Sequence, residues 1–139
     1  MATTTAAFTL TSTDLMDNAI NLSNTATLTT AGTTTGITET TGLARKKLAS
    51  STLTDLITVA NTDVTAAKSA KVYIRNTGTA TDKYALIGIG DKDGTPIYIG
   101  RLYGNDWMFF PWDANSGEDI TITMSDATET VIEYMVFFE

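Results

Sequence analysis

From residue 43 to the end of the chain, apolar and polar residues alternate with the two-residue period of a β-strand. In Lys71–Arg75, for example, Val72 and Ile74 are expected to face a core, while the residues between them face outward. Segments of this kind, bounded by turn-forming residues, are 45–48, 53–60, 71–75, 84–89, 96–103, 107–112, 120–124 and 131–138. The pattern predicts an all-β fold, an antiparallel β-sandwich or jelly roll of about eight strands.

The first 42 residues have a different pattern: sixteen are threonine and none is lysine or arginine. Residues 7–10 and 20–22 alternate as short strands do, Ser12–Met16 is typical of a single capped helical turn, and 29–42 favours an extended arm or loop. Such a segment buries too little apolar surface to fold alone, because ordering each residue costs about 1–2 kcal/mol of backbone entropy. We therefore expect an extended Thr-rich N-terminal arm at 1–42, held by a partner surface, and a β-sandwich domain at 43–139.

Charge and composition exclude several classes of function. The net charge is −7 and the pI is near 4.4, so we expect no direct nucleic-acid binding, which needs a basic face. Cysteine and histidine are absent, which removes disulfides, thiolate catalysis and imidazole chemistry. No run of 18 apolar residues and no signal-peptide pattern occur, so we expect synthesis in a cytoplasm and no membrane contact.

Candidate catalytic and metal-binding motifs are weak. Asp91–Thr95 resembles half of a calcium loop, but position 102, where such a loop needs an acid, is leucine; a plain hairpin turn is the better interpretation. Glu118 and Asp119 are neighbours on a strand and point to opposite faces, so they cannot form an acid–base pair. We therefore expect no enzymatic activity, no cofactor and no metal.

Three groups of residues are candidates for protein contacts. The sizeable apolar residues of the arm are expected to anchor it. The basic cluster is either an ordinary solvated strand end or a contact with the acidic C-terminal part of a neighbouring copy or with an acidic lattice protein. The aromatic residues are expected near a homo-oligomer contact, most simply a trimer. These residues are Phe8, Leu10, Leu15, Met16, Ile20 and Leu22 in the arm, Arg45, Lys46 and Lys47 in the basic cluster, and Tyr103, Trp107, Phe109 and Trp112 among the aromatics. Alternation is expected to place Trp107 and Phe109 on one face of their strand and Met108 and Phe110 on the other, with Pro111 ending the strand. Alternatively, the rings of Trp107–Trp112 form a platform for stacking a sugar, although most are expected in a core or interface.

Three sequence segments carry a resemblance to a known group of proteins: GITETTGLAR at 36–45, KVYIRNT at 71–77 and GRLYGNDWMFFPW at 100–112. With these motifs, the chain resembles small virion structural proteins of tailed phages, especially marine and cyanobacterial phages. The resemblance covers roughly 36–139, and its motifs are structural rather than catalytic. It implies a β-sandwich head-decoration or cement protein, often trimeric, that clamps neighbouring capsid subunits.

The sequence thus leads to a functional expectation with one main alternative. We expect a non-enzymatic capsid decoration or cement protein on the virion surface that binds the major capsid protein and itself. The alternative is a tail or baseplate component that binds a host glycan through its aromatic face. A fibrous repeat or stalk would favour the alternative, and the sequence contains no such repeat.

Overall fold

The computed structural model describes residues 3–30, 33–37, 39–49, 51–61, 70–114 and 118–138. The chain forms two compact units, Met1–Thr38 and Glu39–Glu139. The division lies four residues before the boundary expected from the sequence, because the short strand β3 (Glu39–Thr40) already pairs with the last strand of the second unit. The Thr40 hydroxyl strengthens this attachment by donating a hydrogen bond of 2.8 Å to the Val136 carbonyl.

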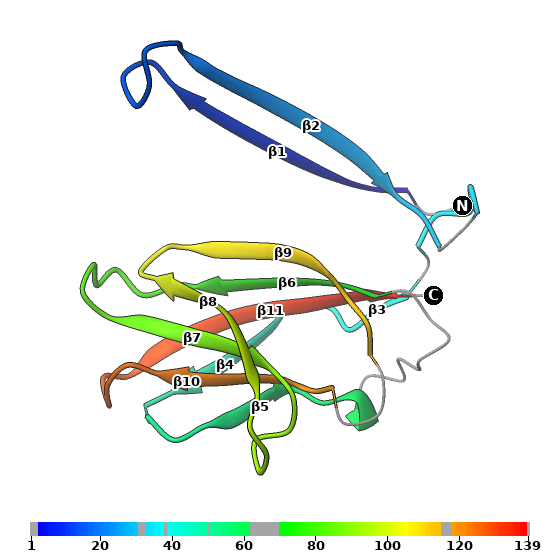
Figure 1. Ribbon diagram of the computed structural model, residues 1–139. Helices are drawn as coiled ribbons and strands as arrows, with labels where there is room; N and C mark the ends of the chain where they lie inside the picture. Colours follow the sequence, from blue (N-terminus) through cyan, green and yellow to red (C-terminus); the bar gives the residue numbers. More distant parts are fainter. Residues whose placement is uncertain are drawn as a thin grey trace. The chain divides into compact units, whose positions relative to one another are not determined.

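The second unit is a two-layered antiparallel β-sandwich with jelly-roll connections (Figure 1). Its remaining strands are β4 (Ala44–Leu48), β5 (Thr54–Ile57), β6 (Ala70–Asn76), β7 (Tyr84–Ile89), β8 (Ile97–Tyr103), β9 (Trp107–Trp112), β10 (Ile120–Met124) and β11 (Thr130–Phe138). One sheet has the order β5-β10-β7-β8; the other has the order β3-β11-β6-β9, with β4 also paired to β11.

The jelly roll follows from the nested pairing of these strands. β4 pairs with β11, β5 with β10, β6 with β9 and β7 with β8, all antiparallel. This is one long hairpin, with its tip between β7 and β8, folded over so that alternate pairs lie in different sheets. The pairing of β11 with β6 joins two of these pairs into one sheet, and the pairing of β10 with β7 joins the other two into the second sheet. The predicted fold class is confirmed, and its eight expected segments correspond to β4–β11.

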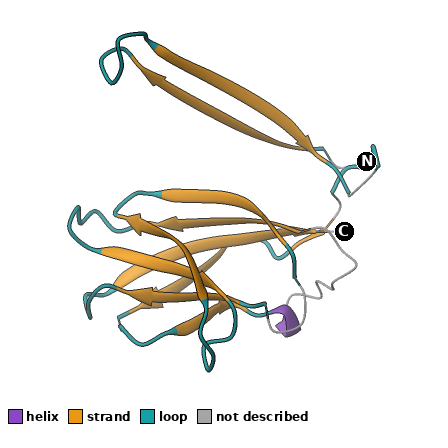
Figure 2. Ribbon diagram, viewed as in Figure 1, coloured by secondary structure: helices purple, strands orange, loops and turns teal. Residues whose placement is uncertain are grey.

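The core lies between the two sheets and is built by strand-period alternation. In β6, Val72 and Ile74 are fully buried, whereas Tyr73 and Arg75 on the other face are partly exposed, as predicted. β10 contributes the fully buried Ile120 and Ile122 from the opposite sheet. The low helix content expected from the sequence is confirmed, since the only helical element among the described residues is the 3-10 turn Val59–Asn61 (Figure 2).

The aromatic strand β9 differs from expectation at its C-terminal end. We expected Pro111 to end the strand, but Pro111 pairs with Lys71 and the strand continues to Trp112. Proline is tolerated here because β9 is the edge of its sheet, where a missing N–H breaks no ladder. Met108, Phe110 and Trp112 consequently share the inward face, while Trp107 and Phe109 face outward.

The first unit is a β-hairpin of two nine-residue strands, β1 (Thr4–Ser12) and β2 (Ile20–Leu28). These strands are longer than the pieces expected at 7–10 and 20–22, and they pair along their whole length. The helical turn expected at Ser12–Met16 does not form; residues 13–18 are bends, although the Leu15 N–H donates to the Ser12 hydroxyl at 3.2 Å. Beyond the hairpin, Thr29 and Gly36 form an antiparallel bridge. Within the described ranges, no helix is long and apolar enough to span a bilayer.

Candidate interaction surfaces

The β1–β2 hairpin has one apolar and one hydroxyl-rich face. Directly paired residues share a face, so Leu10 and Leu22 lie together, as do Ala6 and Ala26. The apolar hairpin face consists of Ala6, Phe8, Leu10, Ile20, Leu22, Ala26 and Leu28 with few interruptions. The opposite face consists of Thr5, Ala7, Thr9, Thr11, Asn21, Ser23, Thr25 and Thr27. Period-two pairing therefore concentrates the apolar side chains of the threonine-rich segment on one side.

This hairpin exposes several large apolar side chains. Phe8, Leu10 and Leu22 are about half exposed, and Leu15 and Met16 in the loop are more exposed still. An isolated two-stranded hairpin is marginally stable in water, because it has no second layer to cover its apolar side. Neither strand contains a charged residue that would discourage association. Five of the six predicted anchors thus lie on exposed surface, while Ile20 is partly buried.

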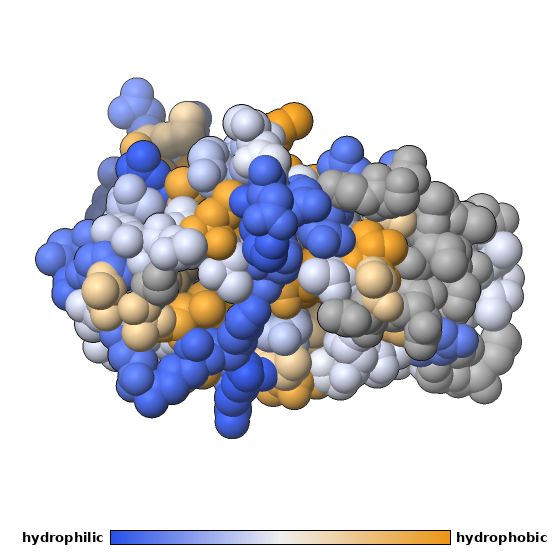
Figure 3. All heavy atoms as spheres, turned by 90° about the horizontal axis from the view of Figure 1, so that it is seen from below, coloured by the Kyte–Doolittle hydropathy of each residue, from blue (hydrophilic) through white to orange (hydrophobic). Residues whose placement is uncertain are grey.

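The outer face of the β3-β11-β6-β9 sheet carries a second group of aromatic and apolar residues. Tyr73 lies between Met135 on one side and Phe109 on the other, as the strand register places them directly opposite one another. The Phe109 ring meets the Phe137 ring edge-on, with centroids 6.2 Å apart. Seen from below the view of Figure 1, the surface has a band of hydrophilic residues between separate hydrophobic patches (Figure 3).

Beside these aromatics, a row of charged residues crosses three strands of the sheet and ends at Trp107 on the fourth. The register aligns Arg45, Glu133, Arg75 and Trp107 on β4, β11, β6 and β9. Arg45 donates from Nε to Glu133 Oε1 at 2.8 Å and approaches the same oxygen with Nη2 at 2.7 Å. Arg75 Nη1 lies 4.0 Å from the other carboxylate oxygen. The Glu133 carboxylate is therefore held between two guanidinium groups.

The basic cluster Arg45–Lys47 is engaged within its own domain. Arg45 pairs with Glu133 as described, and Lys47 Nζ lies 2.6 Å from Glu129. Lys46 points to the other face of the strand and donates to the Asp55 carbonyl at 2.6 Å. The acidic C-terminal part that we expected to meet this cluster in a neighbouring copy thus meets it in the same chain, through the β4·β11 pairing.

The predicted aromatic contact residues do not form one surface. Trp112 is only 3% exposed and donates from its indole Nε1 to the Glu118 carbonyl at 2.9 Å, so it belongs to the core. Tyr103 lies on the other sheet, where its ring meets that of Tyr84 edge-on at 5.4 Å. Trp107 and Phe109 alone remain together on an outward face. Of the four residues, these two are the candidates for an external contact.

Trp107 forms part of a shallow, open groove of about 460 Å³ lined by Tyr73, Arg75, Asn105 and Trp107. Tyr73 and Arg75 come from β6, Trp107 from β9, and Asn105 from the turn that leads into β9. Arg75 lies directly opposite Trp107, and Tyr73 is one pair further along the same face. Apart from Trp107, the lining residues were not among our sequence candidates, although the alternation of 71–75 did place Tyr73 and Arg75 on an outward face.

The turn at one end of the groove is held by backbone hydrogen bonds. Asn105 has a left-handed φ of 68°, a conformation that asparagine tolerates better than most residues. Its N–H donates to the Asn76 carbonyl at 3.0 Å, and the Asn76 N–H donates to the Asp106 carbonyl at 3.0 Å. The buried Asn76 side chain donates in turn to the Leu102 carbonyl at 2.9 Å. The end wall of the groove is therefore tied to the strands beneath it.

The acidic segment Asp91–Gly94 forms a turn held by its own hydrogen bonds. The Asp91 carboxylate accepts a hydrogen bond of 2.8 Å from the Asp93 N–H, and the Gly94 N–H donates to the Asp91 carbonyl at 3.0 Å, so this segment forms the predicted turn. No group of three acidic side chains in the described part of the chain could hold a metal ion.

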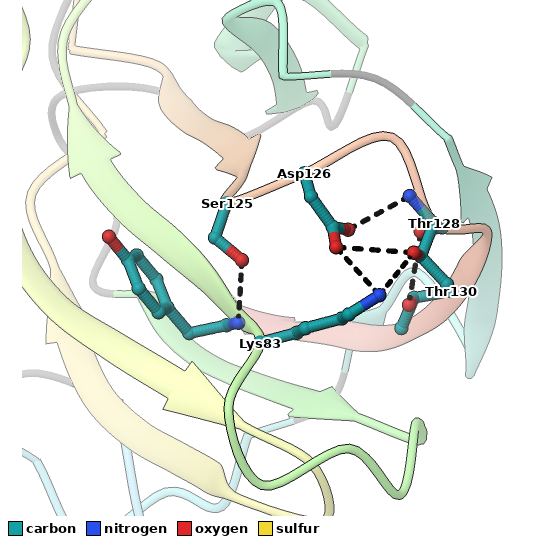
Figure 4. A network of polar contacts seen from close by, with 6 residues as sticks. Lys83, Ser125, Asp126, Thr128 and Thr130 are labelled. Atoms are coloured by element: carbon teal, nitrogen blue, oxygen red, sulfur yellow. Dashed lines mark hydrogen bonds and ion pairs between the residues drawn. The ribbon is translucent and has the colours of Figure 1, made fainter.

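A polar network joins the β10–β11 loop to the start of β7 (Figure 4). Lys83 Nζ lies 2.7 Å from Asp126 Oδ2 and donates to the Thr128 hydroxyl at 2.6 Å, while the Tyr84 N–H donates to the Ser125 hydroxyl at 3.0 Å. The hydrogen bond from Lys83 lowers the pKa of Asp126, and the same bond raises the pKa of Lys83. This arrangement fastens two loops of the jelly roll.

Comparisons with protein-family models, curated proteins and solved structures found no match for this chain.

Proposed function

We propose that this protein is a non-enzymatic virion structural protein, a capsid decoration or cement protein that clamps neighbouring major capsid subunits. The observation that carries the proposal is the apolar hairpin face: an uncharged, amphipathic ribbon whose Phe8, Leu10 and Leu22 are about half exposed. Such a ribbon gains stability by docking on another surface. The jelly-roll fold, which is common in viral capsid proteins, and the motif resemblance support the same assignment.

The energetics of the hairpin suit a contact made during assembly. Burying a phenylalanine or leucine side chain completely contributes about 1.5–3 kcal/mol, before the ordering costs are subtracted. Several such side chains on one face can therefore offset the cost of holding a short ribbon in place. The unpaired edges of β1 and β2 can also extend a sheet of the neighbouring protein through backbone hydrogen bonds.

The test compares two double substitutions that add the same charge to the two hairpin faces. Leu10→Asp/Leu22→Asp places two carboxylates on the apolar face, and Thr9→Asp/Ser23→Asp places them on the adjacent pair of the hydroxyl-rich face. Co-sedimentation with heads stripped of this protein should show binding weakened by about 100-fold or more for the first variant, the equivalent of about 2.8 kcal/mol. Equal losses for both variants, or full binding by the first, would contradict the proposal.

We also propose that the protein self-associates, most simply as a trimer. Phe109 is the residue of the predicted contact that faces outward and lies outside the groove lined by Trp107. Light scattering at micromolar concentration is expected to give an oligomer mass, and a stable monomer would argue against self-association. The Leu10→Asp/Leu22→Asp variant should retain the oligomer, because its substitutions lie outside the sandwich.

A further inference from the structure

We propose that the groove between β6 and β9, lined by Tyr73, Arg75, Asn105 and Trp107, is a binding site for a neutral carbohydrate. This inference goes beyond the clamp function and does not rest on it. All four residues belong to the sandwich, whereas the clamp was assigned to the hairpin. A volume of about 460 Å³ suits one or two sugar rings lying on an open surface.

The aromatic part of the groove suits the flat face of a sugar. Trp107 is 50% exposed, an unusual degree for the largest side chain, and it stands at the sheet edge, where a ligand can approach it freely. Tyr73 is its diagonal neighbour on the same face, because Tyr73 pairs with Phe109 and Arg75 pairs with Trp107. The C–H groups of a pyranose ring carry partial positive charge and pack against the negative face of an indole.

The polar part of the groove supplies both kinds of hydrogen-bonding group that hydroxyls need. Arg75 offers a fork of N–H donors, and its side chain is 41% exposed. Its charged partner, Glu133, is 4.0 Å away, beyond hydrogen-bonding distance, so donors remain for a ligand. The amide of Asn105 and the phenol of Tyr73 can each donate and accept. Together they can engage hydroxyls around the edge of a ring that rests on Trp107.

The charges around the groove favour a neutral ligand over an acidic one. The Glu133 carboxylate lies 4.0 Å from Arg75 and partly offsets its charge. The whole chain carries a net charge of −7, which disfavours the approach of a polyanion.

The groove is organised before any ligand binds. The backbone bonds of Asn105 and Asn76 hold the end wall, and the Gly104 N–H donates to the Ala80 carbonyl at 3.0 Å. An alanine at Gly104 would place its Cβ 2.6 Å from that carbonyl oxygen, so close packing also holds the turn. Little conformational entropy is therefore lost at the turn on binding, which helps a weak, shallow site to be specific.

The experiment is affinity electrophoresis of the full chain in gels containing laminarin, mannan or dextran as neutral probes, and alginate as the acidic probe. We expect retardation in at least one neutral gel. Trp107→Ala should weaken the affinity about tenfold or more, since tryptophans are frequent hot spots of recognition. The matched control is Tyr98→Ala, because Tyr98 is also an aromatic at a sheet edge, 51% exposed, but lies on β8 of the other sheet. It should change the affinity less than about twofold.

Two further measurements make the test decisive. Arg75→Met should weaken binding while preserving most of the apolar stem, whereas Arg101→Met, on β8 of the other sheet, should leave it nearly unchanged. Thermal unfolding of each variant separates loss of binding from loss of fold. No retardation in any neutral gel, retardation in alginate alone, or equal losses for Trp107→Ala and Tyr98→Ala would each overturn the proposal.

Discussion

Replacing Arg45 and replacing Glu133, the two partners of one ion pair, should lower the stability of the protein by different amounts. The Glu133 side chain is 12% exposed, whereas the Arg45 side chain is 68% exposed. Replacing Arg45 leaves a nearly buried carboxylate with Arg75 at 4.0 Å as its remaining charged partner. When Glu133 is replaced, water can hydrate the guanidinium groups of both arginines instead. The loss of Arg45 should therefore cost more than the loss of the Glu133 charge.

The magnitudes follow from what each substitution leaves behind. Arg45→Met keeps the apolar stem on the sheet but removes the N–H contacts of 2.8 and 2.7 Å, so the free energy of unfolding should fall by about 2–3 kcal/mol. Glu133→Gln keeps the shape and an accepting oxygen, so its cost should be about 1 kcal/mol. Lys47→Met breaks a pair with Glu129 in which both side chains are more than half exposed, and should cost less than about 1 kcal/mol.

Urea unfolding followed by tryptophan fluorescence provides the assay. Trp112 is in the core and reports on the sandwich directly. The double variant Arg45→Met/Glu133→Gln should be more stable than Arg45→Met alone, since it removes the buried charge together with its partner. If Glu133→Gln proves as costly as Arg45→Met, or if Lys47→Met matches either of them, the reasoning from burial is wrong.

Three further predictions concern the sandwich. Gly104→Ala should lower the free energy of unfolding by about 1–3 kcal/mol, because its Cβ would lie 2.6 Å from a backbone oxygen, whereas Gly100→Ala, with open space around it, should not clash; urea unfolding of both variants tests this. Ile74→Ala should cost about 2–5 kcal/mol by the same assay, because the side chain is fully buried. The Lys83–Asp126 pair stabilises the fold at neutral pH. Because folding lowers the pKa of Asp126, the stabilisation by Asp126 is lost as the pH falls through the pKa of Asp126 in the folded protein. Because folding raises the pKa of Lys83, the stabilisation by Lys83 is lost as the pH rises through the pKa of Lys83 in the folded protein. The stability difference between wild type and Lys83→Met should therefore shrink in acid, below the usual aspartate pKa of about 4, and in strong base, and a difference constant across both ranges would contradict this.

The strands could be predicted from the sequence because burial of one face in a two-layered sandwich gives each strand a two-residue period of apolar and polar residues. This period is visible within the strand itself. The burial of Trp112 was misjudged for a local reason as well. By ending the strand at Pro111, we placed Trp112 outside the alternation that puts it on the same inward face as Met108 and Phe110. Knowledge that β9 is an edge strand would have removed the error, and edge position is a property of the whole sheet.

The contacts that sequence reasoning missed are long-range. Arg45 and Glu133 are 88 positions apart, and only the nesting of the first and last jelly-roll strands brings them together. The groove likewise joins β6 to the turn before β9, which no local pattern connects. The amphipathic hairpin was hidden because Ala7 and the many threonines blur the alternation of each strand. Its apolar face becomes visible only when the register pairs Leu10 with Leu22.

The two proposed activities depend on different physical features, so each can fail alone. The clamp depends on apolar side chains of an uncharged ribbon, and charges on the apolar face of that ribbon should weaken particle binding without affecting the groove. The groove depends on Trp107 and on donors held by the sandwich, so Trp107→Ala should weaken the affinity for neutral polysaccharides without weakening particle binding. If Trp107→Ala instead weakened binding to heads while polysaccharides had no effect, the outer sheet face would be the capsid contact. The hairpin would then need another partner. Measuring both kinds of binding on the same four proteins, the Leu10→Asp/Leu22→Asp, Thr9→Asp/Ser23→Asp, Trp107→Ala and Tyr98→Ala variants, therefore assigns each surface its ligand.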